Sequence, residues 1–219
     1  MPSKIISLGE ACLVKHNMIR FIGKEETHLF DWVSTRFETV IYILKNIHDT
    51  TLFSKNKFQG PIKDKNYNGD KNCHVMCIYE PFFFRSVHDF PKNIPYMERM
   101  DENIEKFTRR QERLKDTIIT SDVIHFIHCM SKYSSIITPE KIELFKQYLY
   151  NICPSNTYYL HIAIPPECNF IDKDSLSNES VFIYELYEVT PNNNTWQCEE
   201  YNWSDIFDNI KRIDSTNEI

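Results

Sequence analysis

Short apolar runs alternate along this chain with longer stretches of helical periodicity, and this alternation limits the possible folds more than any other feature. The clearest strand-like runs are residues 4–8, 123–128, 158–164 and 181–189. Helical patterns separate them. Strands that alternate with helices form mostly parallel sheets with helices on both faces. The sequence therefore predicts an α/β fold.

The intervals between these runs hold the other predicted elements. They are helices at 11–22, 37–47, 96–118, 139–152 and 203–213 and two further strands at 74–79 and 82–87. Residues 55–72 are polar and lack periodicity, so we predict a surface excursion there. The longest helix carries an apolar stripe that we expect to face the sheet and to be buried. The stripe consists of Met97, Ile104, Phe107, Leu114 and Ile118.

The length of the chain suits one sizeable domain and is short for two, at 219 residues. Neither an internal repeat nor a linker divides it. We therefore predict a single three-layer domain over residues 1–219 with a mostly parallel central sheet. Residues 165–219 form a C-terminal extension of the same domain.

Charge and cysteine content restrict the partners and the compartment. A net charge of −6 argues against nucleic-acid and anionic-membrane partners, which need a basic face. An uninterrupted run of 18 apolar residues, which a membrane-spanning helix needs, does not occur, and the N-terminus becomes polar too early for a signal peptide. Seven cysteines without framework spacing predict free thiols in a reducing compartment. We expect a cytoplasmic protein.

The first candidate site follows the first strand, in the segment Ser7-Leu-Gly-Glu-Ala-Cys12. Cys12 falls near the start of the next helix, where the helix N-terminus stabilises negative charge and lowers a thiol pKa. Such a thiolate is a nucleophile at neutral pH. The alternative is that Cys12 is a small buried apolar residue, the common role of a free cysteine.

His88 and Asp89 close a strand and form the second candidate site. A nearby base turns a thiol into a catalyst, and His88 can act as that base when a carboxylate orients its ring. Successive side chains on an extended chain point to opposite sides, so Asp89 need not be that carboxylate. Asp31, beside Trp32, is another candidate. The alternatives are a strand-ending turn at His88 and a helix N-cap at Asp31.

Arg109 and Arg110 on the long helix offer binding groups for an anion, or partners for Asp31 or Asp89. The alternative is a solvated helix face on which neighbouring glutamates pair with them.

Two groups of cysteine and histidine contain the side chains that bind zinc. They are Cys73-His74 with Cys77, and His125 with His128-Cys129. Both lie in strand-like runs, where neighbouring side chains diverge, and neither forms a CxxC knuckle. Glycine-rich dinucleotide and phosphate motifs are also absent from the sequence. We predict neither a metal nor a cofactor.

Taken together, these motifs resemble an uncharacterised family of bacterial and large-DNA-virus proteins described as papain-like cysteine peptidases. The resemblance covers residues 4–164. The matching segments are Ile6-Ser-Leu-Gly9 with Cys12, Phe30-Asp-Trp32, His88-Asp-Phe90, and Glu105-Lys-Phe with Arg109-Arg110. It implies a thiol hydrolase with Cys12 as nucleophile, His88 as base and an aspartate as orienting acid. The usual papain-like fold, α+β with an antiparallel sheet, is the alternative to the α/β fold. If the protein is viral, the expected location is the host cytoplasm.

We therefore expect a cysteine-dependent hydrolase or acyl transferase that acts on a peptide or small acyl substrate. The sequence leaves the oligomeric state of the protein open. The Cys12 sulfur and the His88 ring should approach to about 3–4.5 Å. Backbone N–H groups at the turn after Gly9, together with the N-terminus of the next helix, should hold the oxyanion. The candidate substrate contacts are Gly9, Glu10, Trp32, Arg109 and Arg110. The alternative function is a non-enzymatic α/β binding or host-interaction module, in which the arginines hold an anion and Cys12 is inert packing.

Overall fold

Four parallel strands form the central sheet of the computed structural model. They are, in spatial order, β1 (Lys4–Ser7), β6 (Val123–Cys129), β7 (Thr157–Ile164) and β8 (Val181–Glu185). The structure describes residues 3–9, 12–61, 73, 76–79, 84–131, 136–166, 168, 173–189, 198–199 and 201–217. The predicted α/β class with a mostly parallel sheet is confirmed.

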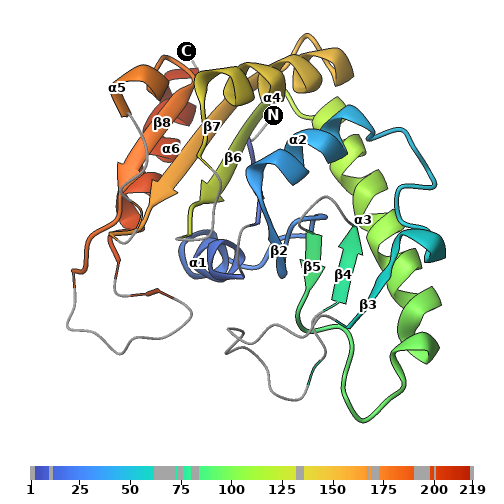
Figure 1. Ribbon diagram of the computed structural model, residues 1–219. Coiled ribbons are helices and arrows are strands. Elements are labelled where there is room, and N and C mark those ends of the chain that lie inside the picture. Colours follow the sequence, from blue (N-terminus) through green and yellow to red (C-terminus); the bar gives the residue numbers. More distant parts are fainter. Residues whose placement is uncertain are drawn as a thin grey trace.

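Helices cover both faces of this sheet (Figure 1). They are α1 (Leu13–Ile22), α2 (Phe37–Lys45), α3 (Met100–Thr120), α4 (Pro139–Ile152), α5 (Lys173–Leu176) and α6 (Ser204–Asn217). Phe126 and Ile162 face the core shared with α2, α3 and α4, whereas Ile127 and Ala163 face α1 and α6. Successive strand residues point to opposite faces, and each strand carries apolar residues on both sides. This arrangement gives the three predicted layers.

A second, antiparallel sheet lies beside α3 (Figure 1). Its strands are, in spatial order, β2 (Val33–Thr35), β5 (Phe84–Ser86), β4 (Met76–Tyr79) and β3 (Gln59–Pro61). Strands β4 and β5 lie within predicted strands, but β2 was not predicted. The excursion predicted for residues 55–72 differs from the structure, because β3 and a 3-10 turn, η1 (Lys55–Lys57), lie there. Residues 62–72 lie outside the described part of the chain.

The apolar stripe of the long helix is confirmed over most of its length. Phe107, Leu114 and Ile118 are fully buried, and Ile104 is half-buried. The prediction is wrong for Met97, which is 59% exposed. The residue lies in a 3-10 turn, η2 (Tyr96–Arg99), that precedes α3. Three residues per turn put Met97 out of phase with a stripe that follows α-helical spacing.

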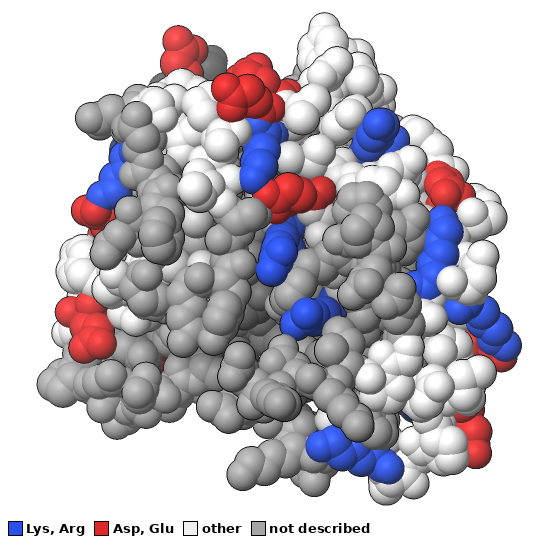
Figure 2. Space-filling view, in the orientation of Figure 1, with Lys and Arg blue, Asp and Glu red and all other residues white. Residues whose placement is uncertain are grey.

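Surface and thiol features complete this description. None of the helices in the described residues is long and apolar enough to cross a membrane. On the face in Figure 2, the described basic and acidic side chains lie intermingled. The exclusion of nucleic-acid partners stays a prediction. The cysteines whose side chains are described are free thiols, namely Cys12, Cys73, Cys129, Cys153, Cys168 and Cys198.

Candidate active site

A tight turn after β1 places Cys12 at the start of α1. Leu8 N donates to Ile127 O at 2.8 Å, which extends the β1–β6 pairing by one residue. Gly9 then adopts a positive φ of 80°. A Cβ at this position would overlap the Thr35 hydroxyl, so both the backbone angle and the space require glycine. The chain reaches Cys12 at the N-cap position of α1.

His88 approaches Cys12 from the antiparallel sheet, and these two residues form the corner that contains the candidate site. It lies in the bend that follows β5, and its side chain is exposed. The distance from Cys12 Sγ to His88 Nε2 is 3.3 Å. The predicted approach of these two groups is confirmed. Cys12 itself is 8% exposed and packs against Val87 and Trp32, so the sulfur lies just beneath the surface beside a histidine that solvent can reach.

Trp32, which contacts Cys12, has a backbone conformation that is uncommon for a residue with a large side chain. Its φ is 65°, in the left-handed region. A bulky residue there carries strain, and such strain persists only where the surrounding structure fixes it. The half-buried Trp32 side chain packs with Cys12 and Val87, so it forms one wall beside the sulfur.

Three basic side chains fix the loop that leads to Trp32 by donating to its carbonyl groups. Lys15 Nζ donates to Glu26 O at 2.9 Å. Arg113 donates to the next carbonyl, Thr27 O, at 2.5 Å, and Arg110 donates to Asp31 O at 3.3 Å. They come from α1 and α3, so the loop is held from two helices.

Asp31, a candidate orienting acid, is paired with lysine. Asp31 Oδ2 lies 3.0 Å from Lys15 Nζ and accepts a hydrogen bond from His28 N at 2.9 Å. The side chains of Asp31 and Lys15 are 0% and 2% exposed. Burial raises the pKa of Asp31, and the charge of Lys15 opposes this rise. The contacts of Asp31 tie the start of α1 to the loop before Trp32.

Asp89, the other candidate acid, also contacts groups other than the imidazole. Its Oδ1 lies 2.5 Å from Lys106 Nζ on α3, and its Oδ2 accepts from Ser86 Oγ at 2.5 Å. Within the described residues, neither Asp89 nor Asp31 hydrogen-bonds to the His88 ring, whose partner is Cys12. The orienting role therefore stays a prediction for both carboxylates.

The thiol pKa differs from the sequence-based expectation. Burial, together with the carboxylates of Asp89 and Asp31, raises the pKa of Cys12 to about 11. The expected lowering by the helix N-terminus is therefore wrong for the free protein, because desolvation of the thiolate outweighs it. At neutral pH the corner holds a neutral thiol that needs a base, and His88 Nε2 is in contact with it.

Backbone N–H groups near the sulfur differ in their availability. The Gly9 N–H, which precedes the predicted oxyanion donors, donates to Ser7 Oγ at 3.2 Å and so already has a partner. In α1, by contrast, the N-cap residue Cys12 makes no side-chain capping hydrogen bond. N–H groups in the first turn of a helix lack intrahelical partners and attract negative charge. They are the better candidates for an oxyanion hole.

The predicted substrate contacts separate in space. Trp32 packs against Cys12, Gly9 lies in the turn before α1 beside Thr35, and Glu10 lies outside the described residues. Arg110 is half-buried and is engaged with the Asp31 carbonyl. Arg109 is exposed and lines a groove with Glu26 and residues of α3. The two arginines thus do not converge as an anion clamp in this structure.

The candidate zinc ligands have other contacts. Cys73 lies within 3.5 Å of His88 O. On β6, His125 hydrogen-bonds to His161 at 2.9 Å and to Asp214 on α6 at 3.0 Å. In the part of the chain that is described, His, Cys, Asp and Glu side chains nowhere gather in threes that could hold a metal ion. His74 lies outside that part.

Sequence reasoning missed several residues of this corner, notably Lys15, Val87 and Lys106. Lys15 follows Cys12 by three residues, which puts both on one side of α1. This spacing was a usable signal, but lysine is almost never fully buried unless it is paired, so the spacing alone does not predict a buried Lys15.

Sequence comparisons identify the protein family to which the chain with this site belongs. Significant matches are absent among curated proteins and among solved structures. A family model described as "putative papain-like cysteine peptidase (DUF1796)" matches residues 3–164. The matched segment contains Cys12, His88 and both candidate acids, and it spans most of the chain. The chain belongs to this family.

Proposed function

We propose that this protein is a cysteine-dependent hydrolase or acyl transferase in which Cys12 is the nucleophile and His88 the general base. The observation that carries the proposal is the distance of 3.3 Å between Cys12 Sγ and His88 Nε2, which lies near the reach of a direct proton transfer. Membership of a family described as cysteine peptidases supports the same assignment.

The reaction begins from a neutral Cys12 thiol, because the thiol pKa is raised to about 11. His88 Nε2 takes the thiol proton as the Cys12 sulfur attacks the substrate carbonyl carbon. The tetrahedral intermediate collapses to a thioester, and the leaving group departs with the proton from His88. Water, or another acyl acceptor, then gives a proton to His88 and attacks the thioester carbon, and that proton returns to the Cys12 sulfur.

The surrounding residues have distinct tasks in this scheme. The first-turn N–H groups of α1 stabilise the oxyanion, and Trp32 forms a wall of the acyl site. Asp89 stabilises the charged imidazole that forms in the transition state, and its pairing with Lys106 limits how far that carboxylate moves.

An activated ester tests the assignment without knowledge of the natural substrate. Incubation with p-nitrophenyl acetate should acetylate Cys12 and release p-nitrophenol in a burst, followed by slower turnover. Cys12→Ala should abolish the burst, and His88→Ala should slow it by about 100-fold or more. Mass spectrometry of the peptide that contains Cys12 locates the acetyl group.

Cys153 provides the matched control for this experiment. This half-buried thiol hydrogen-bonds to Asn156 at 3.0 Å and lies 3.4 Å from the Ser155 hydroxyl. Cys153→Ala should leave the burst unchanged. Acetylation of Cys153 instead of Cys12, or a burst that survives Cys12→Ala, would contradict the proposal.

One observation favours the alternative, a binding module with an inert cysteine. Cys12 is only 8% exposed, and its thiol pKa is raised rather than lowered. In that case iodoacetamide should label Cys12 only after denaturation, because the packed thiol is closed to the reagent. Labelling of Cys12 in the native protein that His88→Ala slows decides for the enzyme.

A further inference from the structure

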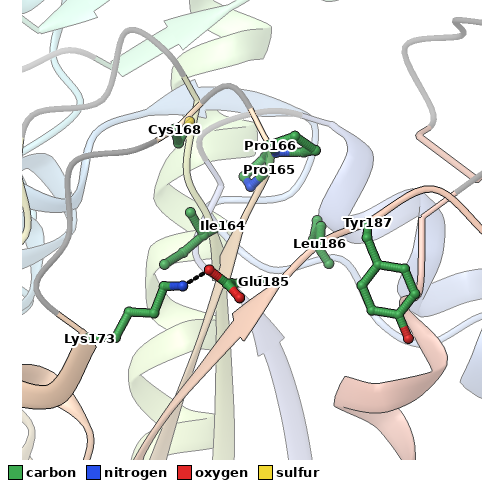
Figure 3. A pocket seen from close by; sticks show the side chains of 8 residues that line it. All are labelled: Ile164, Pro165, Pro166, Cys168, Lys173, Glu185, Leu186 and Tyr187. Carbon is green, nitrogen blue, oxygen red and sulfur yellow. Dashed lines mark ion pairs between the residues drawn. The ribbon is translucent and has the colours of Figure 1, made fainter.

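A cavity lies at the C-terminal ends of β7 and β8. Its volume is about 440 Å³, within the range typical of ligand pockets. Figure 3 shows its lining, which includes Ile164, Pro166, Lys173, Glu185, Leu186 and Tyr187. In open α/β sheets, ligands bind beyond the carboxyl ends of the parallel strands. The cavity occupies that edge of the sheet.

The wall that carries Tyr187 is rigid although its aromatic ring is exposed. Leu186 N donates to Ile164 O at 2.8 Å, which continues the β7–β8 pairing. The buried Asn202 accepts from Tyr187 N at 2.8 Å through its side chain and donates to Tyr187 O at 3.2 Å through its backbone. The Tyr187 side chain nevertheless stays 55% exposed. A fixed backbone with an open aromatic ring suits recognition of an apolar group.

Polar groups at the cavity supply one donor and one acceptor. Lys173 and Glu185 form an ion pair, drawn in Figure 3, and their side chains are 40% and 68% exposed. A lysine donates to a peptide carbonyl, and a carboxylate accepts from a peptide N–H. Together with the apolar wall of Pro166 and Tyr187, this pair suits a peptide segment with an apolar side chain.

Strand register relates the cavity to the candidate active site. Ser7 pairs with Ile127, Ile127 with His161, and His161 with Phe182, so these residues share one level of the sheet. Both β7 and β8 run three residues beyond that level, to Ile164 and Glu185. The chain after β1 turns towards Cys12 over the same stretch. The two sites therefore lie on one edge of the sheet.

Strand spacing sets the separation along that edge between the cavity and the end of β1, from which the chain continues to Cys12. The sheet order places β7 two strands from β1 and β8 three strands from it. At about 4.8 Å per strand, this is about 10–14 Å. An extended peptide covers such a span with about three to four residues.

We propose that the cavity is a specificity subsite, and that it binds an apolar or aromatic side chain of a peptide substrate about four residues from the carbonyl that Cys12 attacks. This inference rests on the proposed function. The subsite binds the part of the substrate on the acyl side of the cleaved bond. That part stays attached to Cys12 from the formation of the thioester until its hydrolysis. Binding energy gained there acts on both steps.

Two peptide chloromethyl ketones test the subsite by their rates of Cys12 alkylation. One is acetyl-Phe-Ala-Ala-Ala-chloromethyl ketone, and the other has alanine in place of phenylalanine. Each rate is divided by the iodoacetamide rate of the same variant, which removes differences in thiol reactivity. The phenylalanine peptide should react about tenfold faster in the wild type, and Tyr187→Ala should bring the ratio close to one. Tyr150 on α4 is a similarly exposed tyrosine, and Tyr150→Ala should keep the wild-type ratio.

Equal rates for the two peptides in the wild type, or a preference that survives Tyr187→Ala, would overturn the subsite. Failure of the proposed function has a different signature, because iodoacetamide then leaves native Cys12 unlabelled. In that case calorimetric titration of Cys12→Ser with N-acetyl-phenylalanine methylamide decides. Binding that Tyr187→Ala removes in the same background supports the cavity as a ligand site, and a lack of binding to Cys12→Ser rejects it.

Discussion

Two aspartate–lysine pairs flank the Cys12–His88 corner, and they differ mainly in burial. The Asp31–Lys15 pair joins the loop before Trp32 to α1, with side chains 0% and 2% exposed. The Asp89–Lys106 pair joins the bend after β5 to α3, with side chains 25% and 18% exposed. Their N–O distances are 3.0 Å and 2.5 Å. Both aspartates were candidate orienting acids on sequence grounds, and the structure separates them by environment.

The difference shows that one type of contact can have two purposes. Removing one partner of a buried ion pair leaves an uncompensated charge in a medium of low polarity. Removing one partner of a partly exposed pair leaves a charge that water still reaches. The buried pair should therefore fix the position of α1 and its cysteine, and the partly exposed pair should adjust the electrostatics around the thiol.

The largest expected effect concerns the buried pair. Lys15→Met leaves Asp31 buried and without its countercharge, so the free energy of unfolding should fall by about 3–5 kcal/mol. Lys106→Met is the matched control and should lower it by about 1 kcal/mol or less. Urea denaturation of both variants at neutral pH measures the two values. Equal losses would show that burial does not distinguish the pairs.

A second substitution sharpens the same comparison. Lys15→Met/Asp31→Asn removes both charges from the buried site, so it should recover about 2–3 kcal/mol of the loss caused by Lys15→Met. Lower pH should also reduce that loss. Burial raises the pKa of Asp31 in the folded protein above its value in the unfolded protein. The free-energy cost of the buried, ionised carboxylate is therefore present above the folded-state pKa. This cost disappears as the pH falls through the folded-state pKa towards the unfolded-state pKa. A loss that stays constant from neutral to acidic pH would assign it to packing.

Particular elements show what the sequence could and could not predict. Strands such as β6 are buried on both faces, so they appear in the sequence as continuous apolar runs, and the parallel sheet followed from them. Strands β2 and β3 have three residues each and lack a pattern of that length. The contact between Cys12 and His88 was predictable because each follows an apolar strand. The Lys15–Asp31 pair was not, because a lysine's burial depends on tertiary neighbours.

The raised thiol pKa shows the same limit. A helix N-terminus is visible in sequence, whereas the packing of Val87 and Trp32 around the sulfur and the approach of two carboxylates are not. Desolvation therefore reversed the direction expected for Cys12. Gly9 is a case where the reason became clear only in three dimensions, since its space is limited by the Thr35 side chain of β2.

The smallest expected effect separates the two aspartates by their influence on Cys12. With a thiol pKa of about 11, the iodoacetamide labelling rate should rise about tenfold for each pH unit between pH 7 and 10, because only the thiolate reacts. Both carboxylates raise this pKa, with Asp89 the larger contributor. Asp89→Asn should therefore increase labelling at pH 8 by about threefold, and Asp31→Asn should increase it less.

The direction of the Asp89→Asn effect also tests its orienting role. A carboxylate that acts only through its charge opposes the thiolate, so its removal speeds labelling. A carboxylate that holds the imidazole in place for proton transfer would instead make labelling slower when it is removed, because His88 would no longer accept the thiol proton efficiently. Labelling of Cys153 in the same samples controls for changes in reagent or fold. Faster labelling combined with slower turnover of p-nitrophenyl acetate would show that Asp89 stabilises the charged imidazole only in the transition state.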